Sequence, residues 1–381
     1  MKKWLIATVS VVAAINMVLA DETTDTQKQT TLGNLFDRID LAIGATGVIQ
    51  GTPGIDDEFN TETDDRTDAA MSFDVELSVG VTENGQAFLL MESGSGDGLD
   101  GNFSSFSGFN GDADDDPNLR VTEFWYEHNW LENKIRIRAG KVDLTSNFDC
   151  NAIANSETDQ FLSGGFVNNL AVDFPSDNGV GGMIWAIPSE LIQVGIGVAD
   201  GDADGDNVFE DMFTIAEIDI MPVIAGQQGN YRVYGWFNDS EHIRITGEGD
   251  TESNSGFGVS LDQGIINSLS IFGRYGMQDE DVAIISQYWS AGLQLSGSLW
   301  GRTDDTFGIA YGSIIMGDNW EDFYESSLLN PGDEGHLEIF YGIAVNGNLN
   351  ISPDIQWIKN ASCREDNDDL WAFGVRAQLT L

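Results

Sequence analysis

Three of the few cations in the chain occupy alternate positions of one short stretch. Residues 133–141 read NKIRIRAGK, so that Lys134, Arg136 and Arg138 share one parity and two isoleucines lie on the other. Strict two-residue alternation is typical of a β-strand, whose successive side chains point to opposite faces. A row of cations on one face can orient water and dipolar solutes in a narrow aqueous passage. The pattern therefore predicts electrostatic selection of solutes.

Acidic residues in the long segment 143–178 are the natural counterpart of this row. Asp149, Glu157 and Asp159 lie in that segment. If the segment folds back toward the cations, the opposed charges create a field across the passage. The alternative is that these acids lie on the outer surface and only keep it solvated. We expect the segment to be a constriction loop.

Polar side chains recur on one parity near the end of the chain. Glu338, Asp354, Gln356 and Arg376 alternate there with apolar residues. Such groups, spaced along a wet wall, donate hydrogen bonds to sugar hydroxyls and accept them. Any water-filled passage has a similar pattern, so these residues alone do not favour sugars over ions.

An acidic stretch, 200–211, matches the twelve-position calcium loop. It reads DGDADGDNVFED, with glycine at position 6 where such loops turn sharply. It departs from the pattern because it ends on aspartate instead of glutamate and is flanked by predicted strands. Calcium is the one metal suggested, and no cofactor is required. The expected ligands are Asp200, Asp202, Asp204, Asp206 and Asp211.

Two classes of function are disfavoured. His128, His242 and His336 are scattered, and there is no G-x-S-x-G, H-E-x-x-H or phosphate-binding glycine loop, so we expect no enzyme. The chain has 63 acidic and 17 basic residues and a net charge of -46, which repels nucleic acid.

Short alternating segments must position these residues. They run from about residue 37 to the last residue and are separated by turns rich in Gly, Asn, Asp and Ser. The chain is therefore predicted to be all-β. The predicted strands are 37–49, 70–81, 85–93, 119–130, 133–142, 179–187, 190–199, 212–222, 229–238, 255–262, 268–277, 286–296, 305–316, 335–346, 347–358 and 368–381.

The connections alternate between tight turns, such as 131–133, and long polar loops, such as 94–118. Short turns at one rim and long loops at the other are typical of a transmembrane antiparallel β-barrel. Keeping that alternation gives sixteen strands and leaves 143–178 outside the ladder, although 166–175 resembles a further strand. In the last strand the parity of Trp371 is entirely apolar, which suits a lipid-facing wall. A soluble sandwich or propeller is the alternative.

Residues 1–20 carry two lysines, an apolar run and a small-residue cleavage pattern, as secretory signals do. The apolar run is shorter than the ~20 residues of a spanning helix, which disfavours a retained anchor. We predict a signal peptide at 1–20, a periplasmic segment at 21–36 and a barrel at 37–381. Cys150 and Cys363 would then meet an oxidising compartment, either as a disulfide or as two free thiols.

Two blocks of the chain carry longer motifs. Residues 120–175 contain GK followed by D-x-x-x-x-F-D-x-N, then QF and FVNN, and residues 338–362 contain PDIQ-x-I. Together they resemble the carbohydrate-selective porin family of Gram-negative outer membranes (OprB type). The matching residues are Gly140, Lys141, Asp143, Phe148, Asp149, Asn151, Gln160, Phe161, Phe166, Val167, Asn168, Asn169, Pro353, Asp354, Ile355 and Gln356.

The resemblance implies a sixteen-stranded barrel, a passive diffusion channel for sugars, and a constriction built by inward-folded loops with charged walls. The chain departs from the family in ending on Leu381 where Phe is usual, and its acidity leaves two further functions open. One is a cation-preferring general porin, and the other is a structural or adhesive barrel with calcium-binding acidic loops. The expected partners are sugars, ions, outer-membrane lipid and lipopolysaccharide, and the barrel is either a monomer or a homotrimer.

Overall fold

The structure, a computed structural model, describes residues 38–53, 66–203, 205, 207–247, 249–327 and 329–381. The signal peptide and the periplasmic segment predicted at 1–20 and 21–36 lie outside these residues and stay predictions. Within the described part of the chain, no helix is both long enough and apolar enough to cross a membrane.

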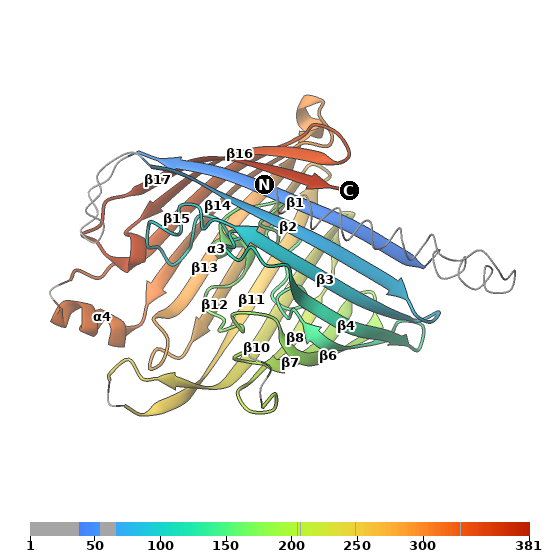
Figure 1. The fold of residues 1–381 in the computed structure, drawn as a ribbon, viewed down its shortest axis with the longest axis horizontal. Helices are drawn as coiled ribbons and strands as arrows, with labels where there is room; N and C mark the ends of the chain where they lie inside the picture. Colours follow the sequence, from blue (N-terminus) through green and yellow to red (C-terminus); the bar gives the residue numbers. More distant parts are fainter. Residues whose placement is uncertain (1–37, 54–65, 204, 206, 248, 328) are drawn as a thin grey trace, which may run out of the picture. The chain divides into compact units, whose positions relative to one another are not determined.

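The described residues form sixteen wall strands that close into one antiparallel ring (Figure 1). β1 pairs with β17, and Ile43 and Leu381 exchange two backbone hydrogen bonds (2.9 and 3.1 Å) beside that pairing. The two-residue β9 (Val223–Ile224) pairs only with the start of β10 and adds no wall strand. The wall strands are β1 (Ile39–Thr52), β2 (Arg66–Gly80), β3 (Gly85–Ser95), β4 (Arg120–Trp130), β5 (Ile135–Val142), β6 (Gly179–Ser189), β7 (Ile192–Asp200), β8 (Met212–Ile220), β10 (Gln227–Ile243), β11 (Thr251–Ile266), β12 (Leu269–Gln278), β13 (Ile285–Ser296), β14 (Thr306–Met316), β15 (Glu334–Ala344), β16 (Leu349–Lys359) and β17 (Leu370–Thr380).

The predicted strand count and the placement of 143–178 outside the ladder are confirmed. Instead of a further strand at 166–175, the short helix α3 (Gly164–Val167) lies at the start of that stretch. Several strand boundaries were wrong: β2 begins at Arg66 instead of residue 70, β10 ends at Ile243 instead of residue 238, and β11 extends beyond the predicted 255–262 at both ends. The difference at the start of β5 moves a predicted site residue. Leu131, Glu132 and Asn133 all have positive φ (52°, 58° and 67°) and build the turn before β5. Lys134 is therefore exposed in that turn and does not belong to the strand.

Apolar side chains cover the outer face of the wall. In β17, Trp371, Phe373 and Val375 are 42–52% exposed, whereas Arg376 is buried on the opposite parity. Neighbouring β16 repeats the pattern, with Ile355 exposed. A soluble core would hide such residues, so this arrangement is that of a wall whose outer face meets lipid.

Long loops and tight turns lie at opposite ends of the barrel. In Figure 1, the helix α4 (Asp318–Ser326) and the loop before β17 extend beyond one end. The turns between β2 and β3 and between β4 and β5 lie at the other end, together with the 3-10 helix η1 (Gly297–Trp300). A second 3-10 helix, η2 (Ala361–Cys363), lies in the loop before β17.

Two segments, which we call the inner loops, pack against the inner face of this wall. They are residues 96–119 and 143–178. In the second, Phe148 stacks on Trp185 of β6 (ring centroids 4.9 Å apart), and Phe161 meets Phe340 of β15 edge-on (5.1 Å). Because the segment contacts the inward parity of strands that are far apart around the ring, it lies inside the barrel.

Asp305 joins two strands at the rim of tight turns. Its carboxylate accepts hydrogen bonds from Arg302 (Nη2–Oδ1 2.9 Å), Tyr341 (Oη–Oδ2 2.6 Å) and the backbone N–H of Ala344 (3.1 Å). These bonds, that from Arg302 above all, lower the pKa of Asp305 to about 2. The carboxylate therefore stabilises the fold above about pH 4 and loses this contribution as the pH falls through its own pKa.

We expect Asp305→Asn to lower the thermal unfolding temperature of the detergent-solubilised protein at neutral pH, because the anionic acceptor of three donors is lost. The difference from the unchanged protein should shrink as the pH falls toward 2. Circular dichroism at a β-sheet wavelength measures the transition. Asp304→Asn is the matched control, because the one bond that Asp304 accepts within the described residues is long (3.4 Å, from Thr303). An equal loss in both variants would contradict the role given to Asp305.

Candidate functional site

One arginine fixes the second inner loop at three points. Arg274 of β12 has a fully buried side chain that forms an ion pair with Asp149 (Nε–Oδ1 2.9 Å). Its other nitrogens donate to the carbonyls of Asp149 (2.8 Å), Phe166 (2.8 Å) and Ala154 (3.2 Å). A guanidinium has five donors in a rigid fork, so one side chain can hold separate turns of a loop together.

Asp149 is fully occupied at this anchor. It has a positive φ of 57°, and its carboxylate also accepts bonds from the Tyr234 hydroxyl (2.8 Å) and the backbone N–H of Asn169 (2.8 Å). Its own N–H donates to Glu217 Oε2 (2.9 Å). The structure thus pairs Asp149 with Arg274 and does not bring it to the cationic row.

The cationic row is partly neutralised within the wall. Arg138 donates to Glu127 on the adjacent strand (Nη2–Oε2 2.9 Å), and Arg136 is 3.8 Å from the same carboxylate oxygen. The guanidinium carbon of Arg138 also lies 3.7 Å from the ring centre of Trp125, an arrangement that stabilises the cation. With Lys134 in the turn, only two of the three predicted cations lie on the wall.

Three of the four predicted wall residues near the C-terminus bond to the inner loops. Glu338 accepts the backbone N–H groups of residues 162 and 163 (2.5 and 3.0 Å), and Arg376 donates to the carbonyls of residues 157 and 160 (2.6 and 2.9 Å). Gln356 donates to the carbonyl of Phe109 in the first inner loop (2.8 Å) and to Asp354 (2.9 Å). These buried side chains act as anchors for loop backbone in this structure.

Sequence reasoning missed several of these anchors. Glu334 of β15 accepts the N–H groups of Phe106, Ser107 and Ser362 (3.0, 2.8 and 2.7 Å), which ties the first inner loop to the loop before β17. Arg274 was also missed. The alternation of each strand could have found them, because it places both side chains on the inward face of the wall. A buried charge on that face requires a partner.

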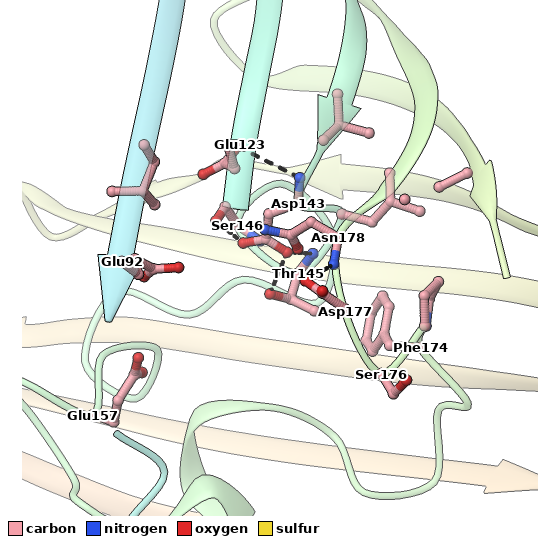
Figure 2. Close-up of a pocket in the computed structure, with 16 residues that line it drawn as sticks. Glu92, Glu123, Asp143, Thr145, Ser146, Glu157, Phe174, Ser176, Asp177 and Asn178 are labelled. Atoms are coloured by element: carbon pink, nitrogen blue, oxygen red, sulfur yellow. Dashed lines mark hydrogen bonds between the residues drawn. The ribbon is translucent and has the colours of Figure 1, made fainter. Parts of the chain in front are cut away.

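A cavity of about 390 Å³ lies between the wall and the second inner loop (Figure 2). Glu92 of β3 and Glu123 of β4 line it from the wall, and Asp143 and Glu157 line it from the loop. The carbonyl of Glu157 is bound by Arg376, whereas its carboxylate faces the cavity. The predicted acid Asp159 is exposed nearby in sequence and does not line this cavity.

Acidic groups of the two inner loops perturb one another. Burial, together with the nearby charges of Glu157 and Asp74, raises the pKa of Asp112 to about 7. Burial also raises the pKa of Glu157, with further contributions from Asp143 and Glu92. Burial is the largest cause of both shifts, and the neighbouring carboxylates add to it.

The calcium hypothesis is not tested by the structure. Asp204 and Asp206 lie outside the described residues. Asp200 is buried and its Oδ2 accepts the N–H of Gly205 (3.1 Å), while Asp211 has a positive φ of 53°. Asp202 is exposed, so calcium binding stays a prediction. Cys150 and Cys363 are free thiols.

Comparison with known proteins agrees with this architecture. Porin B of Pseudomonas aeruginosa is 24% identical over 124 residues, which are 29% of this chain and 27% of Porin B. An uncharacterized protein of Aquifex aeolicus is 28% identical over 224 residues, 58% of this chain and 59% of that protein. The matched segments thus span less than two thirds of either relative.

The fold is also that of a solved structure. The high-pH structure of Pseudomonas putida OprB superposes with a TM-score of 0.78 at 16% sequence identity, covering 92% of this chain and 96% of that one. A family model described as the carbohydrate-selective porin, OprB family, matches residues 60–381. On that match the chain belongs to the OprB family of carbohydrate-selective porins and is a β-barrel porin of the Gram-negative outer membrane.

Proposed function

We propose that this porin is a passive diffusion channel for carbohydrates and other small hydrophilic solutes, narrowed by its two inner loops. The observation that carries the proposal is the anchoring of residues 143–178 to the inner wall by Arg274, Glu338 and Arg376. A loop held at several points narrows a lumen permanently, so solutes are selected by size and polarity without a moving gate.

Solutes in the lumen would therefore meet mainly polar groups of the two inner loops. Glu338, Gln356 and Arg376 already bond to loop atoms, which leaves the cavities beside the loops as the places for sugar hydroxyls. A second cavity of about 590 Å³ is lined by ten residues of the first inner loop between Asp97 and Ala113, together with Gly164, Asn168 and Leu170. Weak contacts of this kind favour passage, because a solute must be released as easily as it is bound.

Liposome swelling tests the carbohydrate proposal. Reconstituted protein should admit glucose and other neutral monosaccharides at rates well above those of empty liposomes and should exclude long oligosaccharides. Equal rates with and without protein would overturn the proposal. A sealed lumen with no ion conductance would instead favour a structural or adhesive barrel, for which calcium binding to 200–211 would then be measured by calorimetry.

Removing the main anchor should widen the passage. Arg274→Met leaves Asp149 buried without its cation, which costs about 3 to 5 kcal/mol at such a site and releases the loop. Single-channel recording should show a larger and noisier conductance, with Arg274→Lys in between because an ammonium reaches fewer of the carbonyls.

Arg244→Met is the matched control for that experiment. Arg244 pairs with Glu252 (2.7 Å) and Asp281 (2.9 Å) at the rim of long loops, and both partners lie outside 143–178. Its loss should leave the conductance unchanged. A folded Arg274→Met barrel with the original conductance would contradict the role of the second inner loop as the constriction.

A further inference from the structure

The last part of the second inner loop, residues 170–178, lies beyond the wall anchors described above, and we call it the return limb. Arg274, Glu338 and Arg376 bond to residues between 149 and 166. The last five residues of the return limb line the cavity of about 390 Å³ (Figure 2). The position of this limb therefore shapes the cavity, and the limb needs contacts of its own to hold it in place.

A bulge in β10 faces the return limb. The pairing of β10 with β8 ends at Asn238, and its register with β11 shifts between Asn238 and His242. Beyond this shift, β10 and β11 continue as a hairpin past the end of the wall (Figure 1). Asn238 is buried at the bulge, and its Nδ2 donates to Asp173 Oδ2 of the return limb (2.8 Å). The bulge therefore brings the hairpin into contact with the second inner loop.

His242 makes the second contact between the hairpin and the limb. Its Nδ1 lies 2.7 Å from the carbonyl oxygen of Ser240, and its Nε2 lies 2.8 Å from Asp173 Oδ2. Both neighbours can only accept, because neither a carbonyl oxygen nor an ionised carboxylate carries a proton. A neutral imidazole has a single N–H, so its other nitrogen would direct a lone pair at one of these oxygens. Only the doubly protonated ring is matched to both contacts at once.

Acidic groups surround this ring. Asp173 approaches it from the return limb, and Glu252 is its cross-strand neighbour on β11. Glu252 is already paired with Arg244 (2.7 Å). The charged residues nearest to the ring along β10 itself are Asp239, Glu241 and Arg244. In the described part of the chain, the pair with His242 is the one ion pair that Asp173 forms, and the two side chains are 21% and 30% exposed, so water can exchange protons with them.

The contact between the hairpin and the limb therefore depends on the charge of one imidazole. Histidine is the side chain that ordinarily changes charge between about pH 5 and pH 8. While the ring is a cation, both His242 and Asn238 hold Asp173. When the ring is neutral and keeps its proton on Nδ1 for Ser240, the lone pair on Nε2 faces the Asp173 carboxylate, and attraction becomes repulsion. Of these two contacts, only the bond from Asn238 then remains.

We propose that His242 is a positioning residue of the constriction, which docks the return limb while its ring is protonated and releases the limb when the ring is neutral. The cavity beside the limb is therefore held in a fixed shape at acidic pH and fluctuates at alkaline pH. This inference rests on the second inner loop being the constriction, as proposed above, and adds control by pH at one end of that loop.

Two variants of fixed charge test the proposal in planar bilayers containing the full barrel. His242→Arg keeps a cation beside Asp173 at every pH, and His242→Gln keeps a neutral amide there. Open-channel current noise is recorded at about pH 5.5 and about pH 8.5, on either side of the range in which histidine changes charge. The unchanged protein should match the arginine variant at the acidic pH and the glutamine variant at the alkaline pH. The released limb should become about threefold more populated, the factor for a partly exposed ion pair.

The protonation of the ring can be followed independently of the current. The chain has three histidines, so nitrogen-15 labelling of histidine in the untagged protein gives three ring systems, and His242→Gln identifies the relevant one. The pH at which its NMR signals change from imidazolium to neutral ring should coincide with the pH at which the noise rises. His128→Gln is the matched control, because His128 bonds to Tyr126 (2.8 Å) at the opposite rim, and it should leave the noise profile unchanged.

The outcomes separate this inference from the proposed function. Noise that rises with pH equally in the unchanged protein and in both fixed-charge variants overturns the role of His242, because another group then titrates. Noise that does not depend on pH in the unchanged protein also overturns it. Either result leaves the constriction intact if Arg274→Met still enlarges the conductance. If neither Arg274→Met nor His242→Gln changes the current, the second inner loop is not the constriction and both proposals about it fail, whereas sugar entry is decided separately by liposome swelling.

Discussion

Closure of the sheet is the constraint on which the rest of this structure depends. Every wall strand, including β1 and β17, has a partner on both sides, so no row of backbone N–H and C=O groups is left open to lipid. Because side chains alternate across such a wall, closure also decides which half of each strand meets lipid. Ile49, Ile355 and Val375 fall on the outer half, and Arg274 and Arg376 on the inner half.

Charged residues on the inner face of the wall also provide hydrogen-bond partners for the two inner loops. The inner loops lie outside the ladder of wall strands, so their backbone N–H and C=O groups need other partners. Charged side chains of the wall therefore act as backbone partners. Glu338 accepts N–H groups, whereas Arg274 and Arg376 donate to carbonyls. Burying these charges is tolerated because each finds several hydrogen bonds.

Sequence parity predicted the wall much better than it predicted the site. Alternation in β16 and β17 correctly assigned Gln356 and Arg376 to the inside, because a two-residue period has only two outcomes. Alternation did not identify the hydrogen-bond partners of inward side chains. Such contacts, for example that of Asp149 with Arg274, join segments that are far apart in the chain. Alternation also placed Lys134 in a strand, although the residues before it adopt the positive φ of a turn. The local alternation predicts whether a side chain faces the lipid or the lumen. Which residues that side chain contacts depends on how the loops fold inside the closed barrel.

The hydrogen bonds that join Ile43 to Leu381 have a consequence for assembly. The pairing joins β1 to β17, the first and last strands of the wall. The barrel therefore cannot close until nearly all of the polypeptide has reached the membrane. Until then β1 presents an unpaired edge, and pairings of such large sequence separation form slowly. The pairing of β17 with β1 should accordingly limit the rate of barrel assembly. Substitutions in the paired part of β1, from Gly44 to Gly51, should slow insertion more than equivalent changes within a hairpin of sequence-adjacent strands.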